Sequence, residues 1–139
     1  MKLFFDTNVV LDLLAAREPC FRDACLVHSL CARGVHEGLV ADFTFCTIAY
    51  ILRREKTVEE MRAALQGIHD ILTVVPVGPR AIADAIASFR GDFEDEVQLR
   101  SALAAGADAI LTRDKSGFSH APIPVMTPTE FLVSASPSH

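Results

Sequence analysis

The amino-acid sequence predicts a three-layer α/β/α fold with a mainly parallel central sheet of about five strands. Short apolar runs of strand length alternate with longer segments of helical period along the whole chain. The runs are continuous rather than alternating in polarity, as expected for strands that are buried on both faces. Alternation of strands and helices is typical of α/β folds, in which helices cover both faces of the sheet.

Five apolar runs are assigned to strands, at residues 2–5, 39–41, 72–77, 109–112 and 123–126. Helical periodicity covers residues 9–15, 21–33, 43–54, 58–71, 81–89 and 95–105, and a short terminal turn is expected at 130–133. Thr57 and Glu60 match a capping box, which marks the start of the helix at residue 58. Gly34 and Gly106 follow periodic segments and predict helix ends.

The chain length of 139 residues fits one domain, and a hydrophobic content of 50% supplies a core without disulfides or a structural metal. We expect the domain at residues 1–133 and a disordered tail at 134–139, because the tail has no large side chain to bury. No apolar run approaches the ~20 residues of a membrane helix. Asp6 interrupts the first apolar segment, which argues against a signal peptide and predicts a cytoplasmic protein.

The chain is acidic, with 18 Asp and Glu against 13 Lys and Arg and a formal charge of −5. This balance disfavours a protein that binds nucleic acid through a broad basic surface, but not one that binds phosphate through bound cations. The four cysteines, at positions 20, 25, 31 and 46, lack zinc-site spacing. They are predicted to be small core residues in a reducing compartment.

Acidic residues follow two of the predicted strands. Asp6 comes directly after the strand at 2–5, and Asp114 follows the strand at 109–112. Asp6 alone fits a helix N-cap equally well, whereas no obvious helix opens after Asp114. Because chemistry in parallel α/β sheets gathers beyond the carboxyl ends of the strands, the two carboxylates are predicted to share one cleft.

A third acidic group begins the helix that leads into the strand at 109–112. Asp95 shares a helical stripe with Leu99 and Leu103 and therefore leans toward the sheet. Asp92 lies three residues earlier and is placed on the same side.

The other two acids of this group are predicted to face solvent. Glu94 shares a helix face with Gln98 and Ser101, and Glu96 precedes Arg100 by four residues, the spacing of a surface ion pair.

Three carboxylates in one cleft repel each other unless a cation lies between them. Mg²⁺ and similar hard ions prefer oxygen ligands, and they can activate a water and stabilise charge on a phosphoryl group. The residues therefore predict a phosphodiesterase dependent on Mg²⁺ or Mn²⁺. Asp6, Asp95 and Asp114 are its predicted catalytic metal ligands, and Asp92 is a further candidate ligand.

The ordered motifs of the chain resemble those of the PIN domain family, specifically its VapC-like ribonuclease toxins. The resemblance is carried by FDTNVVLDLL at 5–14, DFED at 92–95, AL at 102–103, GAD at 106–108, ILTRD at 110–114, PVMTP at 124–128 and Phe131. It implies the parallel fold described above and cleavage of single-stranded RNA with Mg²⁺ or Mn²⁺. It places Asp6, Asp95 and Asp114 at the family's acidic positions, with Asn8 and Thr112 as supporting polar residues.

One position departs from the family pattern. Many members carry a glutamate in the helix after the second strand, where this chain has Thr47. A threonine hydroxyl can bind a metal-bound water but adds no charge, so the number of metal ions is left open. Asp42 and Asp92 are the nearest acids that would compensate.

The resemblance also implies partners, namely an RNA substrate, a small antitoxin and a second copy of the chain. Arg113, Lys115 and Arg17 are the candidate RNA-binding cations, because they lie near the predicted cleft. Two other functions are open at this point. The fold could bind RNA or protein with a degraded metal site, which Thr47 favours, or Asp6 could be the covalent nucleophile of a phosphatase.

Overall fold

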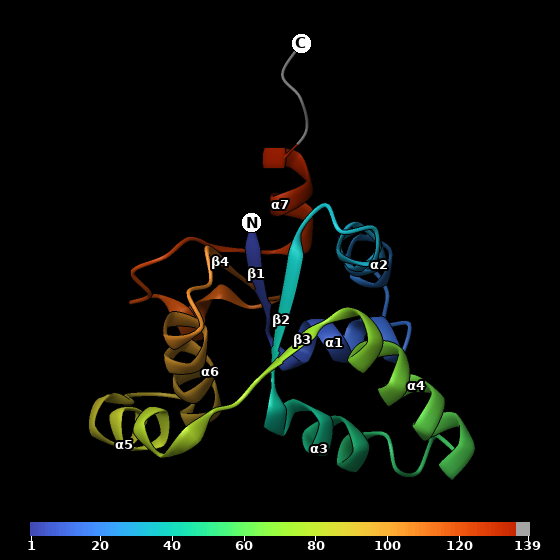
Figure 1. Ribbon diagram of the computed structural model, residues 1–139, viewed down its shortest axis with the longest axis horizontal. Coiled ribbons are helices and arrows are strands. Elements are labelled where there is room, and N and C mark those ends of the chain that lie inside the picture. Colours follow the sequence, from blue (N-terminus) through green and yellow to red (C-terminus); the bar gives the residue numbers. More distant parts are fainter. Residues whose placement is uncertain (136–139) are drawn as a thin grey trace.

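The computed structural model describes residues 1–135 and confirms the predicted fold, with a parallel sheet between two helical layers (Figure 1). The strands are β1 (Lys2–Phe5), β2 (Glu37–Ala41), β3 (Thr73–Val75), β4 (Ala109–Leu111) and β5 (Val125–Met126). The helices are α1 (Thr7–Leu14), α2 (Phe21–Ala32), α3 (Asp42–Ile51), α4 (Val58–Ile71), α5 (Gly78–Ser88), α6 (Phe93–Ala104) and α7 (Pro128–Ala135), with a 3-10 turn η1 at Lys115–Phe118.

The sheet has the strand order β3-β2-β1-β4-β5, and every pairing is parallel. The chain builds outward from β1 through β2 and β3, and then continues on the other side of β1 with β4. Phe5 pairs with Leu111, and the amide of Asp6 donates to the Leu111 carbonyl at 3.0 Å. The strand order therefore reverses between β1 and β4, the position at which parallel α/β sheets form binding crevices.

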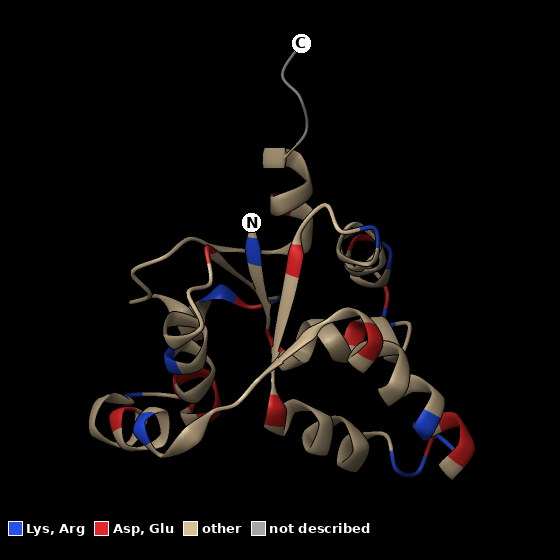
Figure 2. Cartoon of the chain, viewed as in Figure 1, with Lys and Arg blue, Asp and Glu red and all other residues tan. Residues whose placement is uncertain are grey.

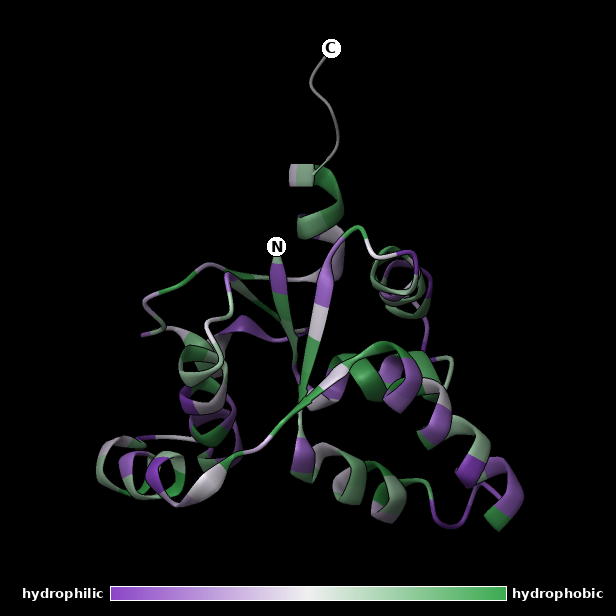
Figure 3. Ribbon diagram, viewed as in Figure 1, coloured by the Kyte–Doolittle hydropathy of each residue, from purple (hydrophilic) through white to green (hydrophobic). Residues whose placement is uncertain are grey.

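The two faces of the sheet pack against different helices. Leu3 and Phe5 belong to a core with α1, α2, α4 and α7, whereas Phe4 and Ile110 pack on the opposite face with α6. In Figure 1, α5 and α6 lie on one side of the strands and α1 to α4 on the other. Figure 3 shows hydrophobic residues along most of the strands. Burial on both faces explains why the strand sequences are continuously apolar.

Strand β4 ends at Leu111, one residue earlier than predicted, and two other strands are shortened further because neighbouring residues do not support a ladder. The predicted strand at 72–77 is reduced to Thr73–Val75, since the Leu72 amide still donates to α4 and Pro76 has no amide hydrogen. The strand at 123–126 begins at Val125, directly after Pro124. The capping box at Thr57 and the helix ends before Gly34 and Gly106 are confirmed.

The end of the chain and the cysteines need two corrections. Helix α7 runs to Ala135, so residues 134 and 135 are helical rather than part of a disordered tail, while 136–139 lie outside the described residues. Cys31 is buried as predicted, Cys20 and Cys25 are only partly buried, and Cys46 is exposed and is not a core residue. No helix within residues 1–135 is long and apolar enough to cross a membrane.

Candidate active site

Asp6 directly follows β1, and its carboxylate is almost completely buried. It is 2% exposed, and both of its oxygens accept hydrogen bonds from side chains. Gln98 Nε2 donates to Oδ1 at 2.8 Å, and Thr112 Oγ1 donates to Oδ2 at 2.8 Å. Burial raises the pKa of Asp6 above its ordinary value, against the opposing effect of these two bonds. The partners are neutral, so they orient the carboxylate without cancelling its charge.

Asp95 lies in the field of four other acids. Burial raises its pKa to about 7, and the negative charges of Asp6, Asp92, Glu94 and Asp114 add to that shift. These five residues are called the acidic site below. Asp6, Asp95 and Asp114 therefore lie close enough to interact, as the strand-end positions predict.

The turn η1 packs directly on Asp95. A Cβ atom at position 117 would overlap the Asp95 carboxylate, so a larger residue there would displace that side chain. Gly117 therefore brings the segment after Asp114 onto the first turn of α6.

Glu94 is a member of the acidic site that the sequence pattern placed in solvent. It is half-buried, and its pKa is raised by burial first and then by the charges of Asp6 and Asp92. Gln98, expected on the same solvent face, is 1% exposed and touches Asp6. The spacing of four residues correctly places Glu94 and Gln98 on one face of α6. That face is buried rather than exposed to solvent.

Asp114 is exposed and caps η1. Its Oδ1 accepts from the Ser116 amide at 3.0 Å and from the Ser116 hydroxyl at 2.7 Å. These bonds hold the pKa of Asp114 below its ordinary value, so this carboxylate is ionised at neutral pH. The expectation that no helix opens after Asp114 is wrong, because η1 begins there.

The carboxylates of the two compensating candidates both accept hydrogen bonds from backbone amides. Asp92 Oδ1 accepts from the Asp95 amide at 3.0 Å, which is an N-cap of α6. Asp42 accepts from the Phe43 amide at 2.7 Å and from the Val77 amide at 3.4 Å. Figure 2 shows acidic residues at the starts of α3 and α6, at the carboxyl end of the sheet. Asp92 is a member of the acidic site, whereas Asp42 is not among the described acids whose charges act on Asp95.

The donor chemistry of the acidic site fits a hard divalent cation, since its ligands are carboxylate oxygens that share one field. Their present arrangement is not a finished coordination shell. No group of three or more His, Cys, Asp or Glu in the described chain is placed to hold a metal ion. Asp6, Asp92 and Asp114 each accept bonds from protein donors instead.

Comparison with known proteins identifies the family. The model of the PIN domain family matches residues 2–116. This chain belongs to the PIN domain family. It is 26% identical over 137 residues to Ribonuclease VapC1 of Aquifex aeolicus (strain VF5), a match that covers 94% of this chain and 92% of the relative.

Solved structures confirm the fold of this PIN domain. The Mycobacterium tuberculosis toxin VapC20, described as cleaving the sarcin-ricin loop, has a TM-score of 0.66 at 15% identity, with 84% of this chain and 93% of that chain covered. The VapBC2 structure of Rickettsia felis, bound to a DNA fragment of its promoter, has a TM-score of 0.65 at 12% identity, with 91% and 97% covered. At these identities the likeness is one of fold.

The predicted supporting residues of the PIN domain differ in their placement. Thr112 binds Asp6 directly, and the Asn8 amide helps to lower the pKa of Asp6. Thr47 donates its hydroxyl to the Phe43 carbonyl of its own helix at 3.3 Å. Thr44, one turn earlier, is fully buried and shares a 2.9 Å hydrogen bond with the Thr7 hydroxyl. Thr44, which sequence reasoning missed, therefore links α3 to the acidic site.

Two of the three predicted RNA-binding cations of the PIN domain are held in ion pairs. Arg113 Nη1 lies 2.8 Å from Asp12 Oδ1, and the Asp12 side chain is 2% exposed. Lys115 Nζ lies 2.9 Å from Glu130 Oε2, with both side chains about half exposed. Arg17 is partly exposed, and its positive charge acts on Asp12. The Arg113 pair neutralises a buried carboxylate and so contributes to the fold, whereas both members of the Lys115 pair are open to solvent.

Proposed function

We propose that this PIN domain is a metal-dependent endoribonuclease that cleaves single-stranded RNA and is the toxin of a toxin-antitoxin pair. The observation that carries the proposal is the convergence of Asp6, Asp95 and Asp114 at the switch point of the sheet, where Asp95 has a pKa of about 7. The relatives described above, a ribonuclease and a toxin that cleaves the sarcin-ricin loop, support the same reaction class.

In this proposal the acidic site is the metal-binding site. Asp6, Asp95 and Asp114 would hold Mg²⁺ or Mn²⁺, with Asp92 and Glu94 beside them. The ion would activate a water and stabilise charge on the scissile phosphate.

The surrounding polar groups keep the ligands in place. Gln98 and Thr112 fix the orientation of the Asp6 carboxylate, and the Thr7 amide donates to Gln98 Oε1 at 3.0 Å. Such support of a ligand by its neighbours maintains metal affinity.

Cleavage of a single-stranded oligoribonucleotide with Mn²⁺ tests the proposal. The wild-type protein should cleave it, and Asp6→Asn should lose cleavage while remaining folded by circular dichroism. Asp70→Asn is the matched control, because Asp70 is an exposed carboxylate on α4 that accepts a hydrogen bond from Gln66 and lies outside the acidic site. Equal cleavage by the wild type and Asp6→Asn would contradict the proposal.

A binding domain with a degraded metal site is the second candidate. Thr47 favours it, because its hydroxyl is engaged within α3 and contributes no charge to the acidic site. In this case the wild-type protein would show no heat of Mn²⁺ binding at millimolar metal. A cytoplasmic location is a prediction in either case.

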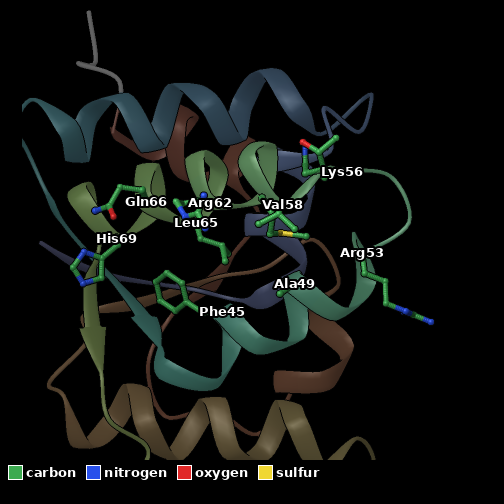
Figure 4. A pocket seen from close by; sticks show the side chains of 11 residues that line it. Phe45, Ala49, Arg53, Lys56, Val58, Arg62, Leu65, Gln66 and His69 are labelled. Atoms are coloured by element: carbon green, nitrogen blue, oxygen red, sulfur yellow. The ribbon is translucent and has the colours of Figure 1, made fainter.

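The antitoxin partner is proposed to bind a groove between α3 and α4 (Figure 4). The groove has a volume of about 590 Å³ and an apolar floor that includes Phe45 and Leu65. Arg53, Lys56 and Arg62 also line it, so its charge suits an acidic amphipathic segment. Similar structures include toxin–antitoxin complexes, one of them from Klebsiella pneumoniae.

Arg62→Glu should weaken co-purification with a small protein encoded beside this one, and unchanged co-purification would contradict the assignment.

A second copy of the chain is proposed to cover the apolar surface formed by α5, Phe89 and the start of α6. Ile82, Ile86, Phe89 and Phe93 are large apolar side chains with exposures of 39%, 61%, 44% and 37%. Monomeric proteins rarely expose such a group together, and a twofold dimer would bury it by bringing the same surface of two copies together. Sedimentation equilibrium should show a dimer for the wild type and a monomer for Ile86→Lys, whereas a monomeric wild type would contradict this assignment.

A further inference from the structure

A polar pocket lies beside the acidic site and has no role in the function proposed so far. Its volume is about 560 Å³, within the range of small-molecule sites. It is formed by the end of α5, the start of α6 and the segment that follows η1. Ser88, Arg90, Glu96, Ser119 and His120 line it, so it is called the Glu96 pocket.

The Glu96 pocket is built around a buried carboxylate. Glu96 is 3% exposed, which corrects its predicted place in a surface pair. The pair with Arg100 is present, at 3.0 Å from Nε to Oε2, and Arg100 Nη2 also donates to the Ser88 hydroxyl at 3.0 Å. On the other side, His120 Nε2 lies 2.9 Å from Glu96 Oε1. Glu96 therefore fixes one edge of the His120 ring.

The fixed ring leaves groups available to a ligand. With Nε2 on Glu96, the His120 Nδ1 atom has no protein partner among the described residues, and the side chain is 54% exposed. Arg90 is exposed and likewise makes no ion pair or hydrogen bond within residues 1–135. The pocket thus combines an oriented aromatic ring with an unpaired guanidinium.

The Glu96 pocket is continuous with the acidic site. Asp92, Ser116 and Gly117 line the pocket. Asp92 acts on the pKa of Asp95, Ser116 binds Asp114, and Gly117 packs on the Asp95 carboxylate. A polymer with one phosphate at the acidic site would therefore place a neighbouring unit in this pocket.

We propose that the Glu96 pocket binds the nucleotide next to the scissile phosphate, with its base against His120 and its phosphate at Arg90. Single-stranded nucleic acid is bound by aromatic rings that stack on bases and by cations that contact the backbone. Arginine suits phosphate because its planar guanidinium donates several hydrogen bonds. This inference rests on the proposed function for the identity of the polymer as RNA.

Steady-state cleavage of an oligoribonucleotide with Mn²⁺ gives the first test. His120→Gln keeps a donor for Glu96 but removes the ring, and Arg90→Gln removes the cation. Each should raise KM while kcat stays within about twofold, and the rise for His120→Gln should be about fivefold or more, the lower end of the loss for one base contact. Arg22→Gln is the matched control, since Arg22 is an exposed arginine on α2. Effects equal to those of Arg22→Gln, or a loss confined to kcat, would overturn the proposal.

Binding without metal separates this inference from the nuclease itself. In EDTA, the affinity of a fluorescent five-nucleotide RNA should fall about fivefold in His120→Gln and in Arg90→Gln, but not in Arg22→Gln. In the wild type, the imidazole NMR signal of His120 should move on titration with the same RNA. A wild type that binds in this way but never cleaves would refute the nuclease and support the pocket. An unmoved His120 signal at saturating RNA would overturn the pocket assignment.

Discussion

Asp6 and Glu96 are both almost completely buried, at 2% and 3% exposure, yet their partners differ in charge. Asp6 accepts bonds from the neutral side chains of Gln98 and Thr112. Glu96 faces the guanidinium of Arg100 and the ring of His120. Asp6 therefore lies beside Asp95 with only neutral hydrogen-bond donors among the described residues, whereas Glu96 is paired with a guanidinium.

This difference separates a functional acid from a structural one. An uncompensated buried charge costs stability, so its presence beside other acids indicates a site for an external cation. A buried carboxylate paired with arginine needs no such ligand, and its loss leaves a partner unpaired. The predictions below test this distinction, from the largest expected effect to the smallest.

Asp95→Asn should produce the largest loss of activity. Removal of an outer partner of a metal ligand already costs about 10–100-fold, so loss of a ligand should lower RNA cleavage by at least ~100-fold. The Asp92 cap on the residue-95 amide is kept, because that bond uses the backbone. Cleavage rates with Mn²⁺ measure the effect, and a loss below tenfold would place the metal elsewhere.

Asp95 should also make the stability of the metal-free protein depend on pH. Its pKa is raised from 3.8 to about 7, so its stabilising contribution is complete below pH 3.8 and is lost as the pH rises through 7. Thermal melts in EDTA should therefore show a fall in Tm between pH 4 and 7 that is smaller in Asp95→Asn. An identical pH dependence in both proteins would show that Asp95 is not perturbed.

Glu96→Ala should destabilise the fold more than it affects metal binding. Loss of one partner from a fully buried ion pair costs about 3–5 kcal/mol, and the partial exposure of Arg100 reduces this to about 2 kcal/mol. Urea unfolding gives the free energy, and Arg80→Ala is the control from an exposed pair. Equal free energies of unfolding for Glu96→Ala and Arg80→Ala would show that the buried pair of Glu96 is no more stabilising than an exposed pair. Glu96 would then not be a structural acid in contrast to Asp6.

Arg113→Ala should have an intermediate effect on stability. It leaves Asp12, a third buried carboxylate, without its ion-pair partner, and the exposure of Arg113 limits the cost to about 1–2 kcal/mol. The free energy of unfolding from urea titration tests this value. An unchanged free energy together with weaker RNA binding would assign Arg113 to the substrate instead.

Lys115→Ala should have the smallest effect. Its pair with Glu130 is open to solvent, so the free energy of unfolding should change by less than about 0.5 kcal/mol. If Lys115 contacts one phosphate, KM for RNA should rise about threefold at low salt and less at high salt. No change in KM at either salt concentration would remove Lys115 from the RNA-binding residues.

The strand-end acids were accessible to sequence analysis because their positions follow from local patterns. Asp6 and Asp114 directly follow short apolar runs, and parallel strands bring such ends together. Asp95 was accessible through its helical stripe. The site residues around them depend on contacts between distant elements, which local patterns do not contain.

Gln98 and Glu96 show why the rest of α6 was misread. Periodicity finds the buried face of a helix that has one exposed face. Helix α6 lies between the sheet, α5 and η1, and the consecutive residues Glu96 to Leu99 are all at most 3% exposed. No single stripe then marks the inward face. The ion pair of Arg113 was missed for a related reason, since Asp12 lies 101 residues away in sequence.

Calorimetric titration with Mn²⁺ tests the central claim that the uncompensated acids form a metal site. The wild type and Glu96→Gln should both bind Mn²⁺, because Glu96 belongs to the neighbouring pocket. Asp6→Asn should lose binding by at least ~100-fold while unfolding at or above the wild-type temperature, since it removes a buried charge. Equal Mn²⁺ affinity in the wild type and Asp6→Asn, or no binding to the wild type at millimolar metal, would contradict the account.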